Sequence, residues 1–158
     1  MVDSEQIAEI YNFYIQNTHH TFETERINPV EMQKRINQII ENYPFLVCEE
    51  NQEIFGYAFA TQYKSRCAYK NSAEVSVYIK NGLKQKGIGT KLYEKLFEEL
   101  SKTEVHAIIA GIALPNEASI KLHEKFGFEK VAHFREVGFK FERWIDVGYW
   151  ELLTHLTR

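Results

Sequence analysis

The sequence predicts one α/β domain over residues 1–158, built on a single central mixed sheet. Three observations lead to this prediction. Apolar residues recur at helical spacing in some segments and alternate with polar residues in others. The strand pattern at 74–79 continues through a glycine-containing turn into a helical pattern at 88–100. The apolar run at 105–112 is typical of a strand that is covered on both faces.

Two helices are predicted before the first strand. The first helix begins at the capping-box pattern Asp3-Ser4-Glu5-Gln6, and its apolar stripe consists of Ile7, Ile10, Tyr11 and Tyr14. The second helix begins at Asn28-Pro29, and its stripe consists of Met32, Ile36, Ile39 and Ile40.

Strands and one more helix follow. A hairpin is predicted from strands 45–49 and 54–63, and it precedes the 74–79 strand and the 88–100 helix. Asn116 is suited to cap a short helix that ends at Gly127, a residue that tolerates the left-handed conformation. Strands near 128–137 and 147–154 complete the sheet.

Composition and charge argue against several classes of function. The net charge is −3 and the lysines are dispersed, so neither property favours a nucleic-acid partner. The acidic start is unlike a secretory leader, and the apolar run around 107–114 is too short to cross a bilayer, so no membrane partner is expected. Two cysteines without a CxxC pattern indicate a reduced, cytoplasmic setting. The histidines lack the spacing of metal ligands, and no metal is expected.

The turn at 84–90 is the strongest candidate for a binding site. It reads Lys-Gln-Lys-Gly-Ile-Gly-Thr. Backbone N–H groups and the helix dipole at a helix start favour an anion, and Gly87 and Gly89 let a pyrophosphate approach the main chain. Lys84 and Lys86 add positive charge there.

The spacing of this turn excludes two common phosphate-binding motifs. Leu92 occupies the position of the third glycine of a dinucleotide fingerprint. Ile88 occupies the position of the lysine in a nucleotide-triphosphate loop. An ordinary strand-to-helix turn stays open as the alternative.

The turn resembles the pyrophosphate-binding arm of the GNAT acyltransferase superfamily, which reads Gln/Arg-x-x-Gly-x-Gly/Ala, with Lys84 at the Gln/Arg position. Motifs along nearly the whole chain resemble, in the same order, those of phosphinothricin acetyltransferases. They are Ile10-Tyr11-Asn12, Thr21-Phe22-Glu23, Tyr43-Pro44, Gly56-Tyr57-Ala58, Arg66-Cys67-Ala68-Tyr69, Glu74-Val75-Ser76-Val77-Tyr78, Asn116-Glu117-Ala118-Ser119, Leu122-His123-Glu124-Lys125, Gly127-Phe128, Val137-Gly138-Phe139-Lys140, Trp144 and Asp146-Val147.

The resemblance implies a GNAT-like fold, in which a mostly antiparallel sheet contains one splayed parallel pair and helices cover both faces. It implies acetyl-CoA as cofactor and an N-acetyltransferase that acts on a small amino acid analogue such as phosphinothricin or methionine sulfoximine. It also implies a homodimer. Relatives carry a short strand before the first helix, whereas this chain starts almost at that helix. Either the sheet lacks that edge strand or the numbered start is not the native one.

Two residues are candidates for catalysis. Glu74 opens the strand that leads into the phosphate turn, about where a pantetheine arm would deliver its thioester, and the resemblance implies a general base there. A solvated carboxylate is the alternative. His123 stands where many GNAT enzymes have a tyrosine that protonates the thiolate. The alternative is a histidine packed between Leu122 and Phe126.

The remaining site residues are implied mainly by the resemblance. The cofactor set comprises the backbone of Val77, Tyr78 and Ile79, the turn residues Lys84, Gln85, Lys86, Gly87, Ile88, Gly89 and Thr90, and Asn116 and Lys125. The acceptor set comprises Lys64, Ser65, Arg66, Val75 and Ser76, since cations and hydroxyls suit a carboxylate and a phosphinate or sulfoximine group. The aromatic residues Tyr11, Phe22, Phe139 and Trp144 are candidate walls of the acceptor pocket.

Two other functions stay open. The same cofactor could serve a different acceptor, namely a protein N-terminus, a polyamine or an aminoglycoside. The chain could also be a non-catalytic acyl-CoA-binding module. Such a module would tolerate loss of Glu74, Lys64 and Arg66, and all three are present.

Overall fold

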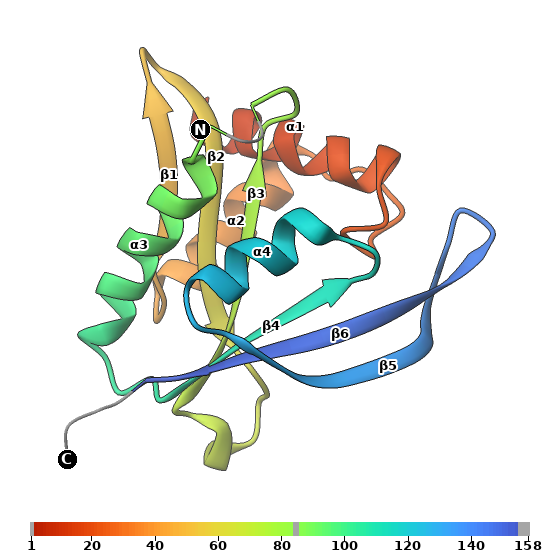
Figure 1. The fold of residues 1–158 in the computed structure, drawn as a ribbon. Coiled ribbons are helices and arrows are strands. Elements are labelled where there is room, and N and C mark those ends of the chain that lie inside the picture. The colour runs from red at the N-terminus through yellow and green to blue at the C-terminus, as the bar shows by residue number, and fades with distance from the viewer. Residues whose placement is uncertain (1, 84–85, 155–158) are drawn as a thin grey trace.

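A computed structural model describes residues 2–83 and 86–154 (Figure 1). Its six-stranded sheet has the order β1-β2-β3-β4-β6-β5. The helices are α1 (Val2–Asn17), α2 (Pro29–Ile40), α3 (Ile88–Ser101) and α4 (Glu117–Lys125), with a short 3-10 helix, η1 (Cys67–Tyr69). The strands are β1 (Phe45–Glu50), β2 (Glu53–Gln62), β3 (Ser72–Ile79), β4 (Ala107–Ala113), β5 (Glu129–Lys140) and β6 (Arg143–Leu153).

The predicted mixed, mostly antiparallel sheet is confirmed. Strands β3 and β4 pair in parallel, whereas the other neighbouring strands pair antiparallel. The parallel ladder runs only from Ser72–Ala107 to Glu74–Ile109. Beyond Glu74, β3 continues to Ile79 and β4 to Ala113 without further pairing, so the two strands splay apart.

Helices cover both faces of the sheet, as predicted (Figure 1). On one face, α1 and α2 pack through Ile7, Ile15 and Met32 against Ile54 and Tyr57 of β2. On the other face, α3 and α4 enclose a larger core that contains Tyr93, Leu96, Ile108, Phe128 and Trp150. Alternation along each strand sends neighbouring side chains to opposite faces, so the two cores share the same strands.

Two predicted helix starts are confirmed by their caps. The side chain of Asn28 accepts a hydrogen bond from the Glu31 N–H at the start of α2. The side chain of Asn116 accepts one from the Ser119 N–H at the start of α4, and Gly127 follows this helix with a φ of 90°. The predicted start of α1 was wrong, because the helix already includes Val2 and Ser4 lies buried inside it.

The last two strands are longer than predicted and form a hairpin that projects beyond the rest of the sheet (Figure 1). The segment between the two predicted strands, 138–146, belongs almost entirely to these strands, with Lys140 paired to Arg143. The tight turn places Phe141 and Glu142 at φ values of 52° and 58°. Such turns usually carry Asn-Gly or Asp-Gly, and Phe-Glu gives no such signal.

Strand β4 was expected to be covered on both faces, which is only partly correct. Ile108, Ala110 and Ile112 are buried on the α3 side, whereas Gly111 is exposed on the other face. The reason is the splay beside it, which leaves that face of β4 open to a cavity.

Candidate active site

The splay between β3 and β4 opens into a cavity of about 680 Å³. Its walls come from both splayed strands, the start of α3, most of α4 and the end of α1. Many of the predicted cofactor and acceptor residues line it together: Val75, Ser76, Val77, Tyr78, Ile79, Gly87, Ile88, Gly89, Thr90, Asn116, His123 and Lys125.

The glycine turn forms one end of the cavity. Gly87 is the N-cap of α3 and has a φ of 74°, a conformation that side chains disfavour. A Cβ at Gly87 would have no atom within 4 Å, so this position is open to a ligand. Gly89 serves packing as well, because a Cβ there would lie 3.2 Å from Cδ2 of Leu122 on α4. Lys84 and Gln85 lie outside the described residues, and Lys86 is exposed and does not line the cavity.

A lysine of α4 reaches the same end. Nζ of Lys125 donates a hydrogen bond of 3.3 Å to Oγ1 of Thr90, in the first turn of α3. The ammonium group therefore lies beside the backbone N–H groups of the α3 start. Positive charge, a helix N-terminus and an open glycine together fit a pyrophosphate.

Along the α4 wall, His123 and Tyr93 form a buried pair. The Tyr93 hydroxyl lies 2.9 Å from Nε2 of His123, and Nδ1 of His123 lies 2.7 Å from the carbonyl oxygen of Ser119. A carbonyl can only accept, so Nδ1 carries the proton and Nε2 accepts from the tyrosine. His123 is 3% exposed, and burial lowers its pKa, so the imidazole is neutral at neutral pH.

Glu74 lies where the parallel ladder ends. It is the last residue of β3 that pairs with β4, opposite Ile109, and the splay begins directly after it. Its side chain is half-buried, and burial raises the pKa of its carboxyl group above the usual value of 4.5. Glu74 does not itself line the cavity, but the next residue, Val75, does. A carboxylate with a raised pKa at this position is suited to remove a proton at neutral pH.

The two catalytic candidates lie on opposite sides of the sheet. Val75 packs into the core beneath α3, the side on which Tyr93 and His123 are buried. Tyr78 packs against Tyr11 and Tyr14 of α1, on the other side. Because side chains alternate along a strand, Glu74 and Ser76 share the face of Tyr78. The splay therefore connects a compartment bounded by α3 and α4 with one that faces α1.

The loop with the predicted acceptor cations lies away from the cavity. Lys64, Ser65 and Arg66 are exposed between β2 and η1, and none of them lines the cavity. The ammonium group of Lys64 lies over the rings of Tyr63 and Tyr69, at 5.1 and 5.5 Å from their centroids. This loop leads into the beginning of β3, near the Glu74 end of the strand.

The predicted aromatic walls serve the loop after α1 and the β5–β6 hairpin instead. Tyr11 donates a short hydrogen bond to Glu23, which also forms a bidentate ion pair with Arg35. Phe22 packs on Gly138, where a Cβ would lie 2.4 Å from its ring. Phe139 and Trp144 are exposed on the hairpin, with ring centroids 4.8 Å apart.

Sequence reasoning missed several cavity residues. Tyr14 and His20 line the wall near α1, Gly111 lines the β4 side, and Tyr93 and Lys121 line the α3–α4 side. The stripe on α1 indicated that Tyr14 faces the core but not that it borders a site. His20 carries no motif, and its position depends on the loop that follows α1.

The fold and the site define an acyltransferase that binds a pyrophosphate-containing acyl carrier. A splayed parallel pair creates the slot, a helix start offers backbone N–H groups that suit a pyrophosphate, and a carboxylate stands where the strands separate. Within the described residues, no group of three or more His, Cys, Asp or Glu side chains could hold a metal ion. No helix in 2–83 or 86–154 has the length and apolar character needed to cross a membrane.

Comparison with known proteins agrees with this class. The model of the acetyltransferase (GNAT) domain family matches residues 2–148, so the chain belongs to the GNAT acetyltransferase family. Phosphinothricin N-acetyltransferase of Streptomyces coelicolor is 40% identical over 153 residues, which cover 94% of this chain and 90% of that protein. The L-methionine sulfoximine/L-methionine sulfone acetyltransferase of Salmonella typhimurium is 35% identical, covering 95% of this chain and 88% of that protein.

One similar solved structure contains the cofactor. The phosphinothricin acetyltransferase of Sinorhizobium meliloti in complex with acetyl-CoA superposes with a TM-score of 0.91 at 31% identity, over 97% of this chain and 84% of that one. The chain is thus an N-acetyltransferase that uses acetyl-CoA, which supplies the acetyl group as an activated thioester.

Proposed function

We propose that this protein acetylates the amino group of a small amino acid analogue such as phosphinothricin or methionine sulfoximine. The observation that carries the proposal is the position of Glu74 at the end of the β3–β4 ladder, half-buried beside the cavity. The choice of acceptor is supported by two relatives that are named as acetyltransferases of these compounds and are similar to this chain over nearly their whole length.

Glu74 acts as the general base. An alkyl amine is mostly protonated at neutral pH, and only the neutral form attacks a thioester. Glu74 removes this proton, directly or through water. Its raised pKa makes the carboxylate a stronger base than an exposed glutamate. Both substrates are held next to each other at the splay, so no covalent enzyme intermediate is needed.

The edge of β3 holds the pantetheine arm. Val77, Tyr78 and Ile79 line the cavity beyond the last pair of the ladder, so this edge of the strand faces the cavity rather than β4. Their backbone groups suit the amides of pantetheine, and an N–H here would stabilise the charge that develops on the thioester oxygen. The pyrophosphate lies at Gly87–Thr90 with Lys125, and Asn116 borders the same cavity from the start of α4.

His123 is the candidate proton donor for the leaving thiolate, since it lines the compartment between α3 and α4. It acts together with Tyr93, because the two side chains share a buried hydrogen bond. In this arrangement the imidazole is neutral, with Nδ1–H donated to Ser119, so Nε2 must first take up a proton from Tyr93 or water, and it is this proton that passes to the thiolate.

The acceptor's acidic groups bind at the loop that enters β3. Arg66 offers a planar guanidinium for a carboxylate, and Lys64 and Ser65 offer further donors. Ser76 borders the acceptor side of the cavity directly, and Val75 contributes to it through its backbone because its side chain is buried beneath α3.

The enzyme works as a homodimer in the cytoplasm. The β5–β6 hairpin exposes apolar side chains in a continuous segment, among them Val137, Phe139, Phe141 and Trp144, the last of which is 64% exposed. Apolar exposure of this kind is typical of an interface, and a second copy of the chain is the partner that the family resemblance implies. Both cysteines are free thiols, as expected in a reducing compartment.

One assay tests the proposal. The protein is mixed with acetyl-CoA and a panel of glutamate analogues, free amino acids, polyamines, aminoglycosides and an N-terminal peptide, and thiol release is measured. We expect phosphinothricin or methionine sulfoximine to give the highest kcat/KM. Turnover of another amine alone would overturn the acceptor but keep the enzyme, and no turnover with any amine would favour an acyl-CoA-binding module.

A further inference from the structure

Tyr149 on β6 lies over a strand position that has no side chain. It pairs with Gly111 of β4 in the antiparallel ladder. A Cβ added at Gly111 would lie 3.2 Å from Cε1 and 3.6 Å from Cζ of the Tyr149 ring. Cδ1 follows at 3.7 Å, so one edge of the ring rests on Gly111, closest at Cε1.

This contact fixes the direction of the tyrosine. The ring starts on β6 and leans over Gly111 of β4, the strand that borders the gap to β3. Phe134 of β5 supports the ring with an edge-to-face contact of 5.5 Å between centroids. Gly111 lines the cavity whereas Tyr149 does not, so the ring borders the cavity across Gly111.

The hydroxyl lies on the same face of the sheet as Glu74. Glu74 pairs with Ile109, and Gly111, two residues further along β4, pairs with Tyr149. Partners in a ladder share a face, as do residues two apart in a strand, so Glu74, Gly111 and Tyr149 all face the α1 side. Burial raises the pKa of the Tyr149 hydroxyl first, and the charge of Glu74 raises it further, which agrees with proximity of the two groups.

We propose that the Tyr149 hydroxyl binds the acceptor's amino group from the β6 side of the splay, opposite Glu74 on β3. The inference rests on the proposed function. The phenol oxygen accepts a hydrogen bond from one N–H of the amine, while the Glu74 carboxylate takes the proton that the ammonium loses. With one acceptor on each side, the nitrogen lone pair is directed toward the cavity.

The hydroxyl can be removed alone by Tyr149→Phe, which keeps the ring on Gly111. We expect the KM of the best acceptor from the panel to rise roughly three- to tenfold, as for loss of one hydrogen bond, with the KM of acetyl-CoA unchanged. Tyr43→Phe is the matched control, because Tyr43 packs against the core under α3 and does not line the cavity. It should leave both KM values unchanged.

A second variant tests the geometry. Gly111→Ala adds a methyl group within contact distance of the ring and should displace the hydroxyl, which raises the acceptor KM in the wild-type background. In the Tyr149→Phe background the same methyl group should cause no further rise, because the hydroxyl is already gone. Additive losses would show that Gly111→Ala acts through another contact, and would overturn the proposed path across Gly111.

Calorimetry gives a readout besides activity. Binding of the acceptor to protein saturated with coenzyme A should weaken in Tyr149→Phe by the same factor as the KM rises. Unchanged acceptor binding and unchanged acceptor KM in an active Tyr149→Phe enzyme would overturn this inference alone. Absence of turnover and of acceptor binding in the unaltered protein would overturn the proposed function, and the inference with it.

Discussion

His123 and Tyr93 meet in a buried hydrogen bond of 2.9 Å between Nε2 and the tyrosine hydroxyl, across the two helices that flank the cofactor cavity. Both ring nitrogens of His123 have hydrogen-bond partners, because Nδ1 donates to the Ser119 carbonyl. Burial keeps the imidazole neutral, because it lowers the pKa of His123 below the usual 6.5 by more than the hydrogen bond to Ser119 raises it.

The first prediction concerns acid stability. Because the folded-state pKa of His123 is lowered, its contribution to stability is complete above the unfolded pKa of about 6.5 and is lost as pH falls toward the folded pKa. In urea unfolding, the wild type should lose free energy of unfolding relative to His123→Asn between pH 7 and pH 5, by up to about 1.4 kcal/mol per pH unit. The other histidines cancel in this difference. If the wild type instead gained free energy of unfolding relative to His123→Asn on acidification, the folded protein would favour the imidazolium.

The second prediction concerns the phosphate end of the cavity. Lys125→Ala removes the ammonium group beside Thr90 and should weaken coenzyme A binding roughly tenfold or more, as for loss of a charged hydrogen bond. Calorimetry measures the affinity directly. Lys95→Ala is the matched control, since Lys95 lies on the outer side of α3 and pairs with Glu98 and Glu99. Equal affinities of both variants would remove Lys125 from the cofactor site.

Local elements of this fold follow from the sequence because their causes are local. The caps at Asn28 and Asn116, the turn at Gly87 and the strand that carries Glu74 each depend on neighbouring residues. The splay itself was expected only from the family resemblance, since no residue pattern reveals where a ladder stops.

The parts that sequence reasoning missed depend on residues far apart in the chain. The Tyr93–His123 pair joins residues on separate helices, and the approach of Tyr149 to Gly111 depends on the β4–β6 register. The hairpin turn at Phe141 was missed because its positive φ is imposed by the strands that it joins and not by its own residue type.

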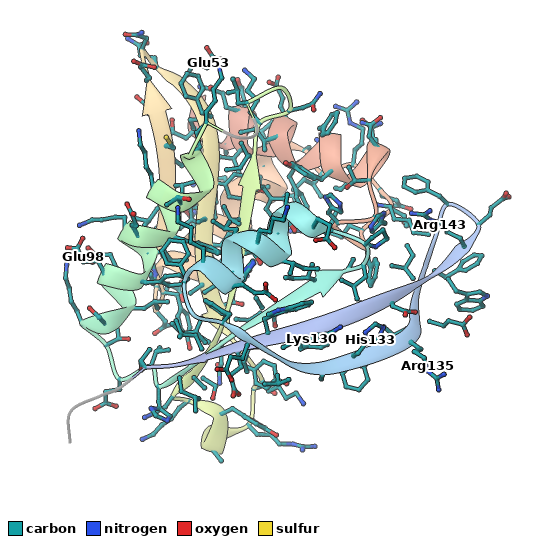
Figure 2. All side chains as sticks on the ribbon, in the orientation of Figure 1. Glu53, Glu98, Lys130, His133, Arg135 and Arg143 are labelled. Atoms are coloured by element: carbon teal, nitrogen blue, oxygen red, sulfur yellow. The ribbon has the colours of Figure 1, made fainter. Side chains whose placement is uncertain are left out.

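The third prediction concerns the acceptor. Arg66→Ala should raise the KM for phosphinothricin or methionine sulfoximine about ten- to a hundredfold and leave the KM of acetyl-CoA nearly unchanged, because a charged hydrogen bond to the carboxylate is lost. Arg135 on β5 is exposed, and Arg135→Ala serves as the control, which should change neither the acceptor KM nor the KM of acetyl-CoA. Figure 2 shows Arg135 on the outward side of the hairpin. An unchanged acceptor KM in Arg66→Ala would place the carboxylate elsewhere.

The fourth prediction concerns assembly. Trp144→Glu places a charge in the exposed aromatic segment of the hairpin and should convert a dimer into a monomer, seen by sedimentation as a halved mass. Glu142→Lys, at the turn of the same hairpin, changes charge without removing apolar area and should leave the mass unchanged. A wild-type protein that sediments as a monomer at every concentration would contradict the proposed interface.

The central claim is that Glu74 is the general base, and the pH dependence of kcat/KM for the acceptor tests it most directly. Glu74→Gln should lower kcat/KM about 10²- to 10⁴-fold with coenzyme A affinity unchanged. Above the raised pKa of Glu74, log kcat/KM of the wild type should level off, because Glu74 takes the ammonium proton, whereas in the variant it should keep rising toward the pKa of the amine, because only the free amine reacts. Glu151→Gln, on the same face but two strands away, should keep the wild-type profile. A Glu74→Gln enzyme with the wild-type rate and slope would contradict the account.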